Sequence, residues 1–483
     1  MPFASSVFLL VFLPVVLLVH ATAPLRLRGP FLLAASILFY AWGAPRFVFV
    51  VILTTFADFY LVRLMAKSER RAVRLAYLWA SIGLNLSLLA AFKYGGFIGE
   101  NVAAISRLFG SHATFTWPAI VLPLGISFYT FETITYVVDV YHGVHPPLTK
   151  PWLYQLYIFL FPKMMAGPIV RFREIADQLP APEGRVPADL WVSGFFRMCL
   201  GLGKKVLLAN PLSEAADWVY GNPGSGWPGL DPSHLSAASA WLAGTAFALQ
   251  VYFDFSGYSD MAAGIGRMLG FRLPENFDHP FTSPSVTVFW RRWHMTLGGF
   301  MREYLYFPLR RTRAGATLGP SAVLALVFLT SGLWHGAAWT FVAWGGLHAI
   351  AILVEQKFDR FFEAIPRFAR VVMTSAYFVM TMVVFRVSGW SDAVRHVAAL
   401  FGAGSGSATF APKGEPLVAL GLGLFFAFFA LSPGSAALAA RVYAERPRRW
   451  ELWAFAAAAI VLLVISLAHL TGRGFRPFVY FRF

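Results

Sequence analysis

The sequence FWRRWHMTLGGFMREYLYFPLRR, residues 289–311, is followed by an apolar run that ends in SGLWHGAAWTFVAWGGLHA, residues 331–349. Each of these two segments places a histidine directly after a tryptophan, at His294 and at His335. An arginine cluster and the apolar run separate the two histidines. Because most of the remaining chain is apolar, this stretch is the candidate for the chemistry of the protein.

The composition excludes a soluble protein. Hydrophobic residues make up 58% of the 483 residues, charged residues make up 13%, and the mean hydropathy is +0.61. A soluble domain carries about 25% charged residues. We therefore expect an all-α, polytopic integral membrane protein that lies in the lipid bilayer. The apolar runs of helical length predict roughly 11–13 transmembrane or re-entrant helices.

The formal charge of +16 is spread over short segments between the apolar runs. Lys163 and the arginines at 291–313 belong to these segments, whereas residues 209–236 hold no Lys or Arg. By the positive-inside rule, the basic segments are cytosolic, and both termini are periplasmic. This distribution gives no basic domain for nucleic acid, and we expect no nucleic-acid partner.

Cysteine and histidine spacing argues against a metal site. The one cysteine, Cys199, excludes an internal disulfide and any site with several cysteine ligands. We interpret it as a packing residue. No HExxH motif occurs, and no GxSxG motif suggests a serine nucleophile. No metal is predicted.

Carboxylates interrupt two of the apolar runs. Glu132 and Asp139 lie in or beside one predicted span, and Asp254 and Asp260 lie at the end of another. Residues 161–174, FPKMMAGPIVRFRE, carry two prolines and predict a broken or re-entrant segment. Ionisable groups at membrane depth cost about 2.5–3.5 kcal/mol, so these carboxylates need partners. Structural hydrogen bonds at helix breaks are the favoured interpretation.

The RRWH segment predicts one amphipathic helix at the cytosolic interface. His294 lies on its apolar side, where it is either a packed core histidine or a functional group. Arg291 and Arg292 either orient the chain or bind the phosphates of an anionic donor. A period of 3.6 residues places the following side chains on one face: Trp290, Trp293, His294, Leu297 and Met301.

The second histidine, His335, lies between two apolar runs and beside Gly332 and Gly336. These glycines allow close helix packing or a local break. A neutral, buried imidazole suits a general base. With His294 and His348 in the same stretch, the pattern leaves catalysis and structure equally open.

Six segments in this order resemble the membrane-bound O-acyltransferase family, and within it a bacterial branch that acts in alginate O-acetylation. They run from about residue 120 to the C-terminus. The segments are PLGISFYTFETITYVVDVYHG (123–143), FPKMMAGPIVRFRE (161–174), YFDFSGYSDMAAGIGRMLGF (252–271), FWRRWHMTLGGFMREYLYFPL (289–309), LWHGAAWTFVAWGGLH (333–348) and FRPFVYFRF (475–483). The sequence departs from the family pattern at LGGF after RRWH and at two arginines, 310 and 311.

The resemblance implies a fold and a pair of site residues. The fold is a ring of helices around a funnel, in one domain of N-terminal spans (1–114), a core (115–386) and C-terminal spans (387–483). The catalytic histidine of the family's WHG motif falls on His335. The second histidine, in its RRWH motif, falls on His294, a candidate donor to the oxyanion or a positioning group.

The resemblance also implies a reaction. An acyl group passes from a cytosolic thioester, acetyl-CoA, towards a hydroxyl acceptor reached from outside, with no bound cofactor. The final acceptor is an exported polysaccharide such as alginate, and a separate periplasmic acetyltransferase-like protein takes part. The location is the bacterial inner membrane. The residues alone also allow a transporter or flippase, in which the intramembrane carboxylates form an ion path, or a non-enzymatic scaffold of an export complex.

Overall fold

The computed structural model describes residues 1–110, 117–118, 122–179, 184–222, 228–387, 389–474 and 476–479. Within these ranges the regular elements are helices, and one isolated strand-like bridge pairs Leu235 with Ala408. This confirms the predicted all-α fold. The chain packs as two compact units, which are Met1–Val186 with Gly266–Pro274, and Pro187–Ile265 with Glu275–Phe483. The single domain with sections beginning at 115 and 387 stays a prediction.

The first unit holds the N-terminal helices. Its longer helices, α3 and α4, pack against each other and against α6. Its elements are η1 (Phe8–Phe12), α1 (Leu13–Thr22), α2 (Leu25–Gly43), α3 (Val48–Lys67), α4 (Arg71–Leu89), η2 (Ala90–Tyr94), α5 (Gly95–Leu108), α6 (Ile126–Tyr141), α7 (Pro151–Phe159), α8 (Phe161–Met164), α9 (Phe172–Ile175) and η3 (Ala176–Gln178).

The segment 161–174 is broken, as predicted. It consists of the single turns α8 and α9 joined by non-helical backbone. Glu132 on α6 lies beside this break, where it is ion-paired with Lys163 and accepts a hydrogen bond of 3.4 Å from the backbone N–H of Val170. Lys163, which the sequence groups with the cytosolic basic segments, is fully buried, and its ammonium is paired with the carboxylate of Glu132, 31 residues earlier in the chain.

The second unit holds the two Trp-His sequences. Its elements are α10 (Ala188–Gly203), η4 (Lys204–Ala209), α11 (Asn210–Tyr220), η6 (Pro232–His234), α12 (Ala237–Met268, whose last turn belongs to the first unit), η7 (Pro280–Thr282), α13 (Val286–Arg292), α14 (Met295–Phe300), η8 (Met301–Tyr306), α15 (Phe307–Arg311), α16 (Arg313–His335), α17 (Trp339–Lys357), α18 (Asp359–Ala364), α19 (Arg367–Arg386), α20 (Trp390–Leu400), α21 (Glu415–Phe428), η9 (Phe429–Leu431), α22 (Pro433–Val442) and α23 (Arg449–Arg473).

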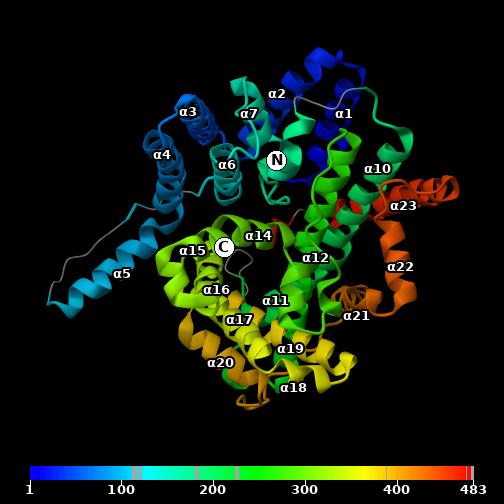
Figure 1. Ribbon diagram of the computed structural model, residues 1–483. Helices are drawn as coiled ribbons and strands as arrows, with labels where there is room; N and C mark the ends of the chain where they lie inside the picture. Colours follow the sequence, from blue (N-terminus) through cyan, green and yellow to red (C-terminus); the bar gives the residue numbers. More distant parts are fainter. Residues whose placement is uncertain are drawn as a thin grey trace. The chain divides into compact units, whose positions relative to one another are not determined.

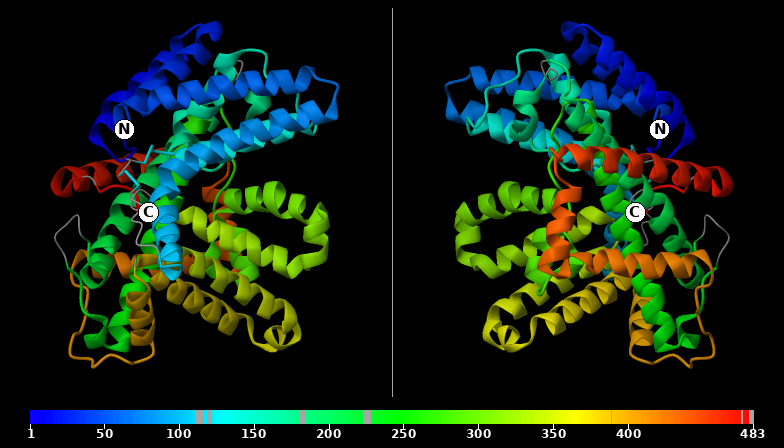
Figure 2. Two further views of the ribbon diagram at one scale, coloured as in Figure 1. Left: turned by 90° about the vertical axis from the view of Figure 1, so that its left-hand side faces the viewer. Right: turned by 90° about the vertical axis from the view of Figure 1, so that its right-hand side faces the viewer.

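Five helical segments among the described residues are long and apolar enough to cross a membrane. A sixth is added if α21 with η9 and α22 form one broken span, in which the helix direction changes by 106° (Figure 2). The other predicted runs form shorter helices, such as α1 and α10, or helices that bury polar side chains, such as α12. The five segments are Val48–Lys67, Arg71–Leu108, Arg313–His335, Arg367–Arg386 and Arg449–Arg473.

Helices α16 and α17 lie side by side and form a tight hairpin (Figure 1). Glycines make this close approach possible, as the sequence predicts. A Cβ atom on Gly332 would lie 2.2 Å from the carbonyl oxygen of Phe341, and one on Gly345 would lie 2.2 Å from that of Phe328. Thr312 caps the start of α16 by accepting a hydrogen bond from a backbone N–H. The hairpin therefore holds His335, at the end of α16, in a defined place.

Candidate active site

His335 is the last residue of α16 and is buried, with 6% of its surface exposed. The helix ends there because Gly336 takes an extended conformation. Three aromatic rings surround the imidazole. The ring centroids of Trp334, Trp344 and Phe385 lie 4.8, 5.1 and 5.5 Å from that of His335, all in edge-to-face arrangements. These contacts fix the ring in an apolar environment at a helix end.

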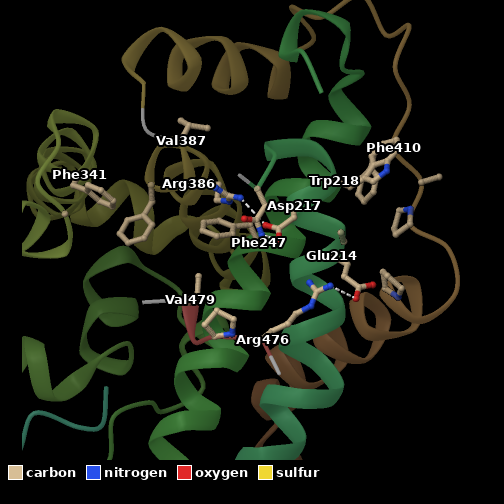
Figure 3. Close-up of a pocket in the computed structure, with 18 of the residues that line it drawn as sticks. Glu214, Asp217, Trp218, Phe247, Phe341, Arg386, Val387, Phe410, Arg476 and Val479 are labelled. Atoms are coloured by element: carbon tan, nitrogen blue, oxygen red, sulfur yellow. Dashed lines mark hydrogen bonds and ion pairs between the residues drawn. The ribbon is translucent and has the colours of Figure 1, made fainter. Parts of the chain in front are cut away.

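A pocket of about 1490 Å³ lies next to His335. Its wall includes Gly336, which follows the histidine, and Phe385, whose ring contacts the imidazole. Figure 3 shows the residues that line it. They come from separated parts of the second unit: 214–222 on and after α11, Phe247 on α12, 336–341 at the turn from α16 to α17, 385–387 at the end of α19, 409–416 before and at the start of α21, and 476–479 near the C-terminus.

Two ion pairs lie in the wall of the pocket. Arg386 contacts the carboxylate of Asp217 at 3.1 Å, and Arg476 contacts Glu214 at 2.8 Å. Figure 3 shows each arginine beside its acidic partner. Arg386 also donates to the backbone carbonyl of Gly221. The pocket therefore combines an apolar wall near His335 with charged groups that can bind a polar ligand.

The C-terminal segment forms part of the same wall. Val479 lines the pocket, and its backbone N–H donates a hydrogen bond of 2.7 Å to Asp254 on α12. The same carboxylate contacts Lys205 at 2.6 Å. Of the predicted motif at 475–483, residues 476–479 are described, and the others lie outside the described residues. Asp254 therefore holds the chain end against the helices that line the pocket.

His294 does not lie in a continuous helix, and the sequence prediction for 289–301 was wrong in this respect. Helix α13 ends at Arg292, and α14 begins at Met295. Between them His294 adopts a left-handed conformation with φ of 45°. For a non-glycine residue this conformation costs of the order of 1–3 kcal/mol, and it persists where the surroundings hold the residue in place. A period of 3.6 residues cannot reveal such a break.

Asn276 is the residue that holds His294. Its side-chain oxygen Oδ1 lies 3.1 Å from Nδ1 of His294 and accepts bonds from the hydroxyl and backbone N–H of Thr296. Its backbone carbonyl accepts from the N–H of Met295 at 2.9 Å. Asn276 therefore accepts hydrogen bonds from the backbone N–H groups at the start of α14, and it also contacts the imidazole of His294. Burial lowers the pKa of His294 from 6.5 to about 3, so the ring is neutral at physiological pH.

The ring of Trp334 lies close to both Trp-His histidines. Its ring centroid is 6.2 Å from that of His294 and 4.8 Å from that of His335. The structure therefore brings together the two sequence candidates, which are 41 residues apart (335 − 294). His348 also packs against Trp344, with ring centroids 4.8 Å apart. Among the described residues neither ring nitrogen of His348 has a hydrogen-bond partner.

The two predicted donor-binding arginines lie in the last turn of α13. Arg291 is exposed, while Arg292 donates a hydrogen bond of 3.0 Å to the hydroxyl of Thr282. Neither residue lines the pocket beside His335. The structure thus leaves Arg291 as the more accessible of the two cations.

Carboxylates that interrupt the predicted spans form buried ion pairs at three positions. Besides Glu132 and Asp254, Asp260 contacts Arg197 at 3.1 Å and Lys204 at 2.6 Å, and Asp139 is buried on α6. The three ion-paired carboxylates support the structural interpretation drawn from the sequence. Cys199 is likewise buried on α10. In the described part of the chain, no three His, Cys, Asp or Glu side chains are grouped to hold a metal ion.

The sequence alone does not identify two residues of the site. Arg386 ends an apolar run and looks like an ordinary helix-terminal charge, and Asn276 lies in a short loop, 271–279, outside every predicted span. The sequence Pro-Glu-Asn-Phe at 274–277 could have drawn attention, because asparagine often caps a helix. The helix that it caps, however, begins 19 residues later (295 − 276). Only the fold shows this relationship.

Comparison with known proteins places the chain in a family. A family model described as MBOAT, membrane-bound O-acyltransferase family, matches residues 151–389. A probable alginate O-acetylase of Azotobacter vinelandii is 37% identical over 84% of this chain and 79% of its own length. One of Pseudomonas putida is 33% identical over 100% of both chains. A peptidoglycan O-acetyltransferase of Helicobacter pylori is 31% identical over 83% of this chain and 80% of its own length. The chain belongs to the membrane-bound O-acyltransferase family, and it is an integral membrane acyltransferase.

Proposed function

We propose that this acyltransferase moves an acetyl group from a cytosolic acyl thioester, acetyl-CoA, to a hydroxyl acceptor for the O-acetylation of an exported polysaccharide such as alginate. The observation that carries the proposal is the position of His335, directly behind the wall of a large pocket. The names of the similar proteins, alginate O-acetylases and a peptidoglycan O-acetyltransferase, support a polysaccharide as the final acceptor.

In the proposed mechanism His335 is the general base. Its neutral imidazole takes the proton from the acceptor hydroxyl, and the oxygen attacks the thioester carbonyl. The new carbon–oxygen bond forms as the carbon–sulfur bond breaks, and the proton passes from His335 to the departing thiolate. The products are the acetyl ester and the free thiol. General-base catalysis of this kind contributes about 10²–10⁴-fold to the rate.

The direction of the helices supports an inward donor and an outward acceptor. Their basic ends at Arg313, Lys357 and Arg367 lie away from the pocket, and their opposite ends line or adjoin it, where Arg386 of α19 is paired with Asp217. We therefore place the pocket on the periplasmic side of the bacterial inner membrane and the basic ends in the cytosol. In the same topology both chain termini are periplasmic. The three helices are α16 (Arg313 to His335), α17 (Trp339 to Lys357) and α19 (Arg367 to Arg386).

The donor and acceptor sides then have separate roles. Arg291, with Arg292 beside it, attracts the phosphates of the donor at the cytosolic surface. His294, whose ring centroid lies 6.2 Å from that of Trp334, serves as the second catalytic histidine. The pocket exceeds the 300–1,000 Å³ of ordinary small-ligand sites. Its size suits a polymer segment or a hydroxyl-bearing segment of a periplasmic acetyltransferase-like partner.

Labelled acetate in cells tests the proposal. Cells that carry His335→Ala should incorporate no labelled acetate into exported polysaccharide, although the membrane holds a normal amount of the protein. The matched control is His20→Ala, which removes a buried histidine of α1 in the other unit. It should leave labelling intact. Normal labelling with His335→Ala at normal abundance would remove His335 from the mechanism.

A further inference from the structure

The chemical environment of His294 determines which of its nitrogens carries the proton. Oδ1 of Asn276 lies 3.1 Å from Nδ1 of His294 and 3.3 Å from the backbone nitrogen of Thr296. A backbone N–H can only donate, so the atom that faces it must be the amide oxygen and not the amide nitrogen. The opposite atom, Nδ2, donates to the hydroxyl of Ser259 at 3.2 Å, which agrees with the same orientation.

An amide oxygen can only accept. Nδ1 of His294 must therefore be the protonated nitrogen of the neutral ring, and Nε2 must carry the lone pair. Nε2 is buried, and it has no hydrogen-bond partner among the described residues. His294 is 1% exposed, and its ring packs edge-to-face on Phe255, with centroids 4.6 Å apart. Among the described residues, the lone pair of Nε2 is thus unsatisfied.

Asn276 is itself held on several sides. The residue before it, Glu275, is ion-paired with Arg197, and one guanidinium N–H of Arg197 donates to it at 2.6 Å. Arg197 also contacts the buried Asp260 on α12 at 3.1 Å. Such a connected network restricts the side chain that it supports, and small displacements there have large effects on a site.

We propose that Asn276 is a positioning residue for acyl transfer, which keeps the proton of His294 on Nδ1 so that Nε2 acts as a hydrogen-bond acceptor in the reaction. This inference rests on the proposed role of His294 in catalysis. With this tautomer Nε2 of His294 accepts a hydrogen bond, whereas the sequence left open that His294 donates one to the oxyanion. The strained left-handed backbone of His294 serves the same end, because it aims the ring at Asn276.

The tautomer can be measured without activity. Protein with ¹⁵N-labelled histidine, purified in lipid nanodiscs, should give a signal for His294 with a protonated Nδ1 and an unprotonated Nε2. The signal is identified by its loss in His294→Gln. In Asn276→Leu the proton should be found on Nε2 or shared between the two nitrogens. A wild-type tautomer in Asn276→Leu would overturn the inference, whatever the activity.

Activity gives the second measurement. Asn276→Leu should lower kcat by about 10²-fold with little change in the KM for acetyl-CoA, since the residue acts through His294. Asn276→Asp retains an accepting oxygen and should recover most of the rate. The matched control is Thr296→Val, which removes another donor to the same oxygen but leaves the bond to His294 intact.

The outcomes separate the inference from the proposed function. If Thr296→Val lowers kcat as much as Asn276→Leu does, Asn276 acts only by holding the start of α14, and the inference is wrong. If His294→Gln keeps full activity, the catalytic role of His294 fails. The tautomer in Asn276→Leu still decides in that case whether Asn276 sets the protonation of the ring.

Discussion

The indole of Trp344 meets the imidazole of His335 edge-to-face, with ring centroids 5.1 Å apart. Trp344 is buried on α17, and its ring also contacts that of His348. The candidate base is therefore positioned by the neighbouring helix of the hairpin as well as by its own. Aromatic contacts of this type contribute about 0.5–1.5 kcal/mol beyond the burial of their surface.

Trp344→Ala should abolish most activity, because it removes the ring that holds His335 and leaves a cavity. A buried tryptophan replaced by alanine costs about 3–5 kcal/mol, so the thermal midpoint should also fall. Trp344→Phe should retain much of both. Acyl transfer and thermal unfolding in detergent measure the two effects. Trp339→Ala is the matched control on the same helix, since Trp339 is 61% exposed. Equal effects of Trp344→Ala and Trp339→Ala would contradict the account.

The glycines of the hairpin give a second prediction. Gly332→Ala forces a Cβ atom to within 2.2 Å of a backbone carbonyl, which cannot move aside without separating α16 from α17. It should destabilise the protein by about 1–3 kcal/mol and reduce acyl transfer. Gly346→Ala, on the same helix pair, places its Cβ atom 3.5 Å from a leucine side chain and should be tolerated. Comparable thermal midpoints for the two variants would show that the close crossing is not needed.

The charged residues of the pocket predict that a substitution there changes the KM for the acceptor and not the KM for the donor. Arg386→Gln should raise the KM for the acceptor about tenfold and leave the KM for acetyl-CoA unchanged, because Arg386 lines the pocket and not the basic surface. Steady-state kinetics with each substrate varied in turn would measure this. Arg395→Gln is the control, an exposed arginine that is ion-paired with Asp392 outside the pocket lining. A change in the KM for acetyl-CoA alone would show that the pocket binds the donor and not the acceptor, which contradicts the proposal.

The buried state of His294 predicts a dependence of stability on pH. Burial lowers the pKa of the folded ring from 6.5 to about 3, so below pH 6.5 the unfolded chain binds a proton that the folded chain does not. The stability that depends on this group is therefore present above about pH 6.5 and is lost as the pH falls towards 3. The thermal midpoint of the wild-type protein should drop more between pH 7.5 and pH 5 than that of His294→Gln. An equal drop in both proteins would mean that His294 is not buried as described.

Much of the architecture follows from patterns within short stretches of sequence. Composition and apolar runs predict an all-α membrane protein, the prolines at 162 and 168 predict the break between α8 and α9, and Gly332 predicts the close hairpin. Each of these rests on a property that a short segment carries by itself. The membership of the acyltransferase family likewise follows from short segments in a fixed order.

The features of the fold and the site that the sequence does not predict depend on residues far apart in the chain. The left-handed His294 breaks a helix that periodicity predicts, because Asn276, 18 residues earlier, supplies the bonds that hold the break. Lys163 is buried because its ammonium is paired with the carboxylate of Glu132 on another helix. The pocket combines segments from 214 to 479, and no local pattern marks them as neighbours. Such relationships arise only when the helices pack.

The release of free CoA by purified protein tests the central claim, that His335 catalyses acyl transfer. The wild-type protein in nanodiscs, given acetyl-CoA and a polysaccharide acceptor, should release CoA only when the acceptor is present, in step with the formation of the acetyl ester. The His335→Ala protein, folded with a similar thermal midpoint, should be slower by about 10²–10⁴-fold. Release of CoA at the wild-type rate by His335→Ala would contradict the claim. Absence of any CoA release from the wild-type protein, with the acceptor present, would contradict the proposed reaction itself.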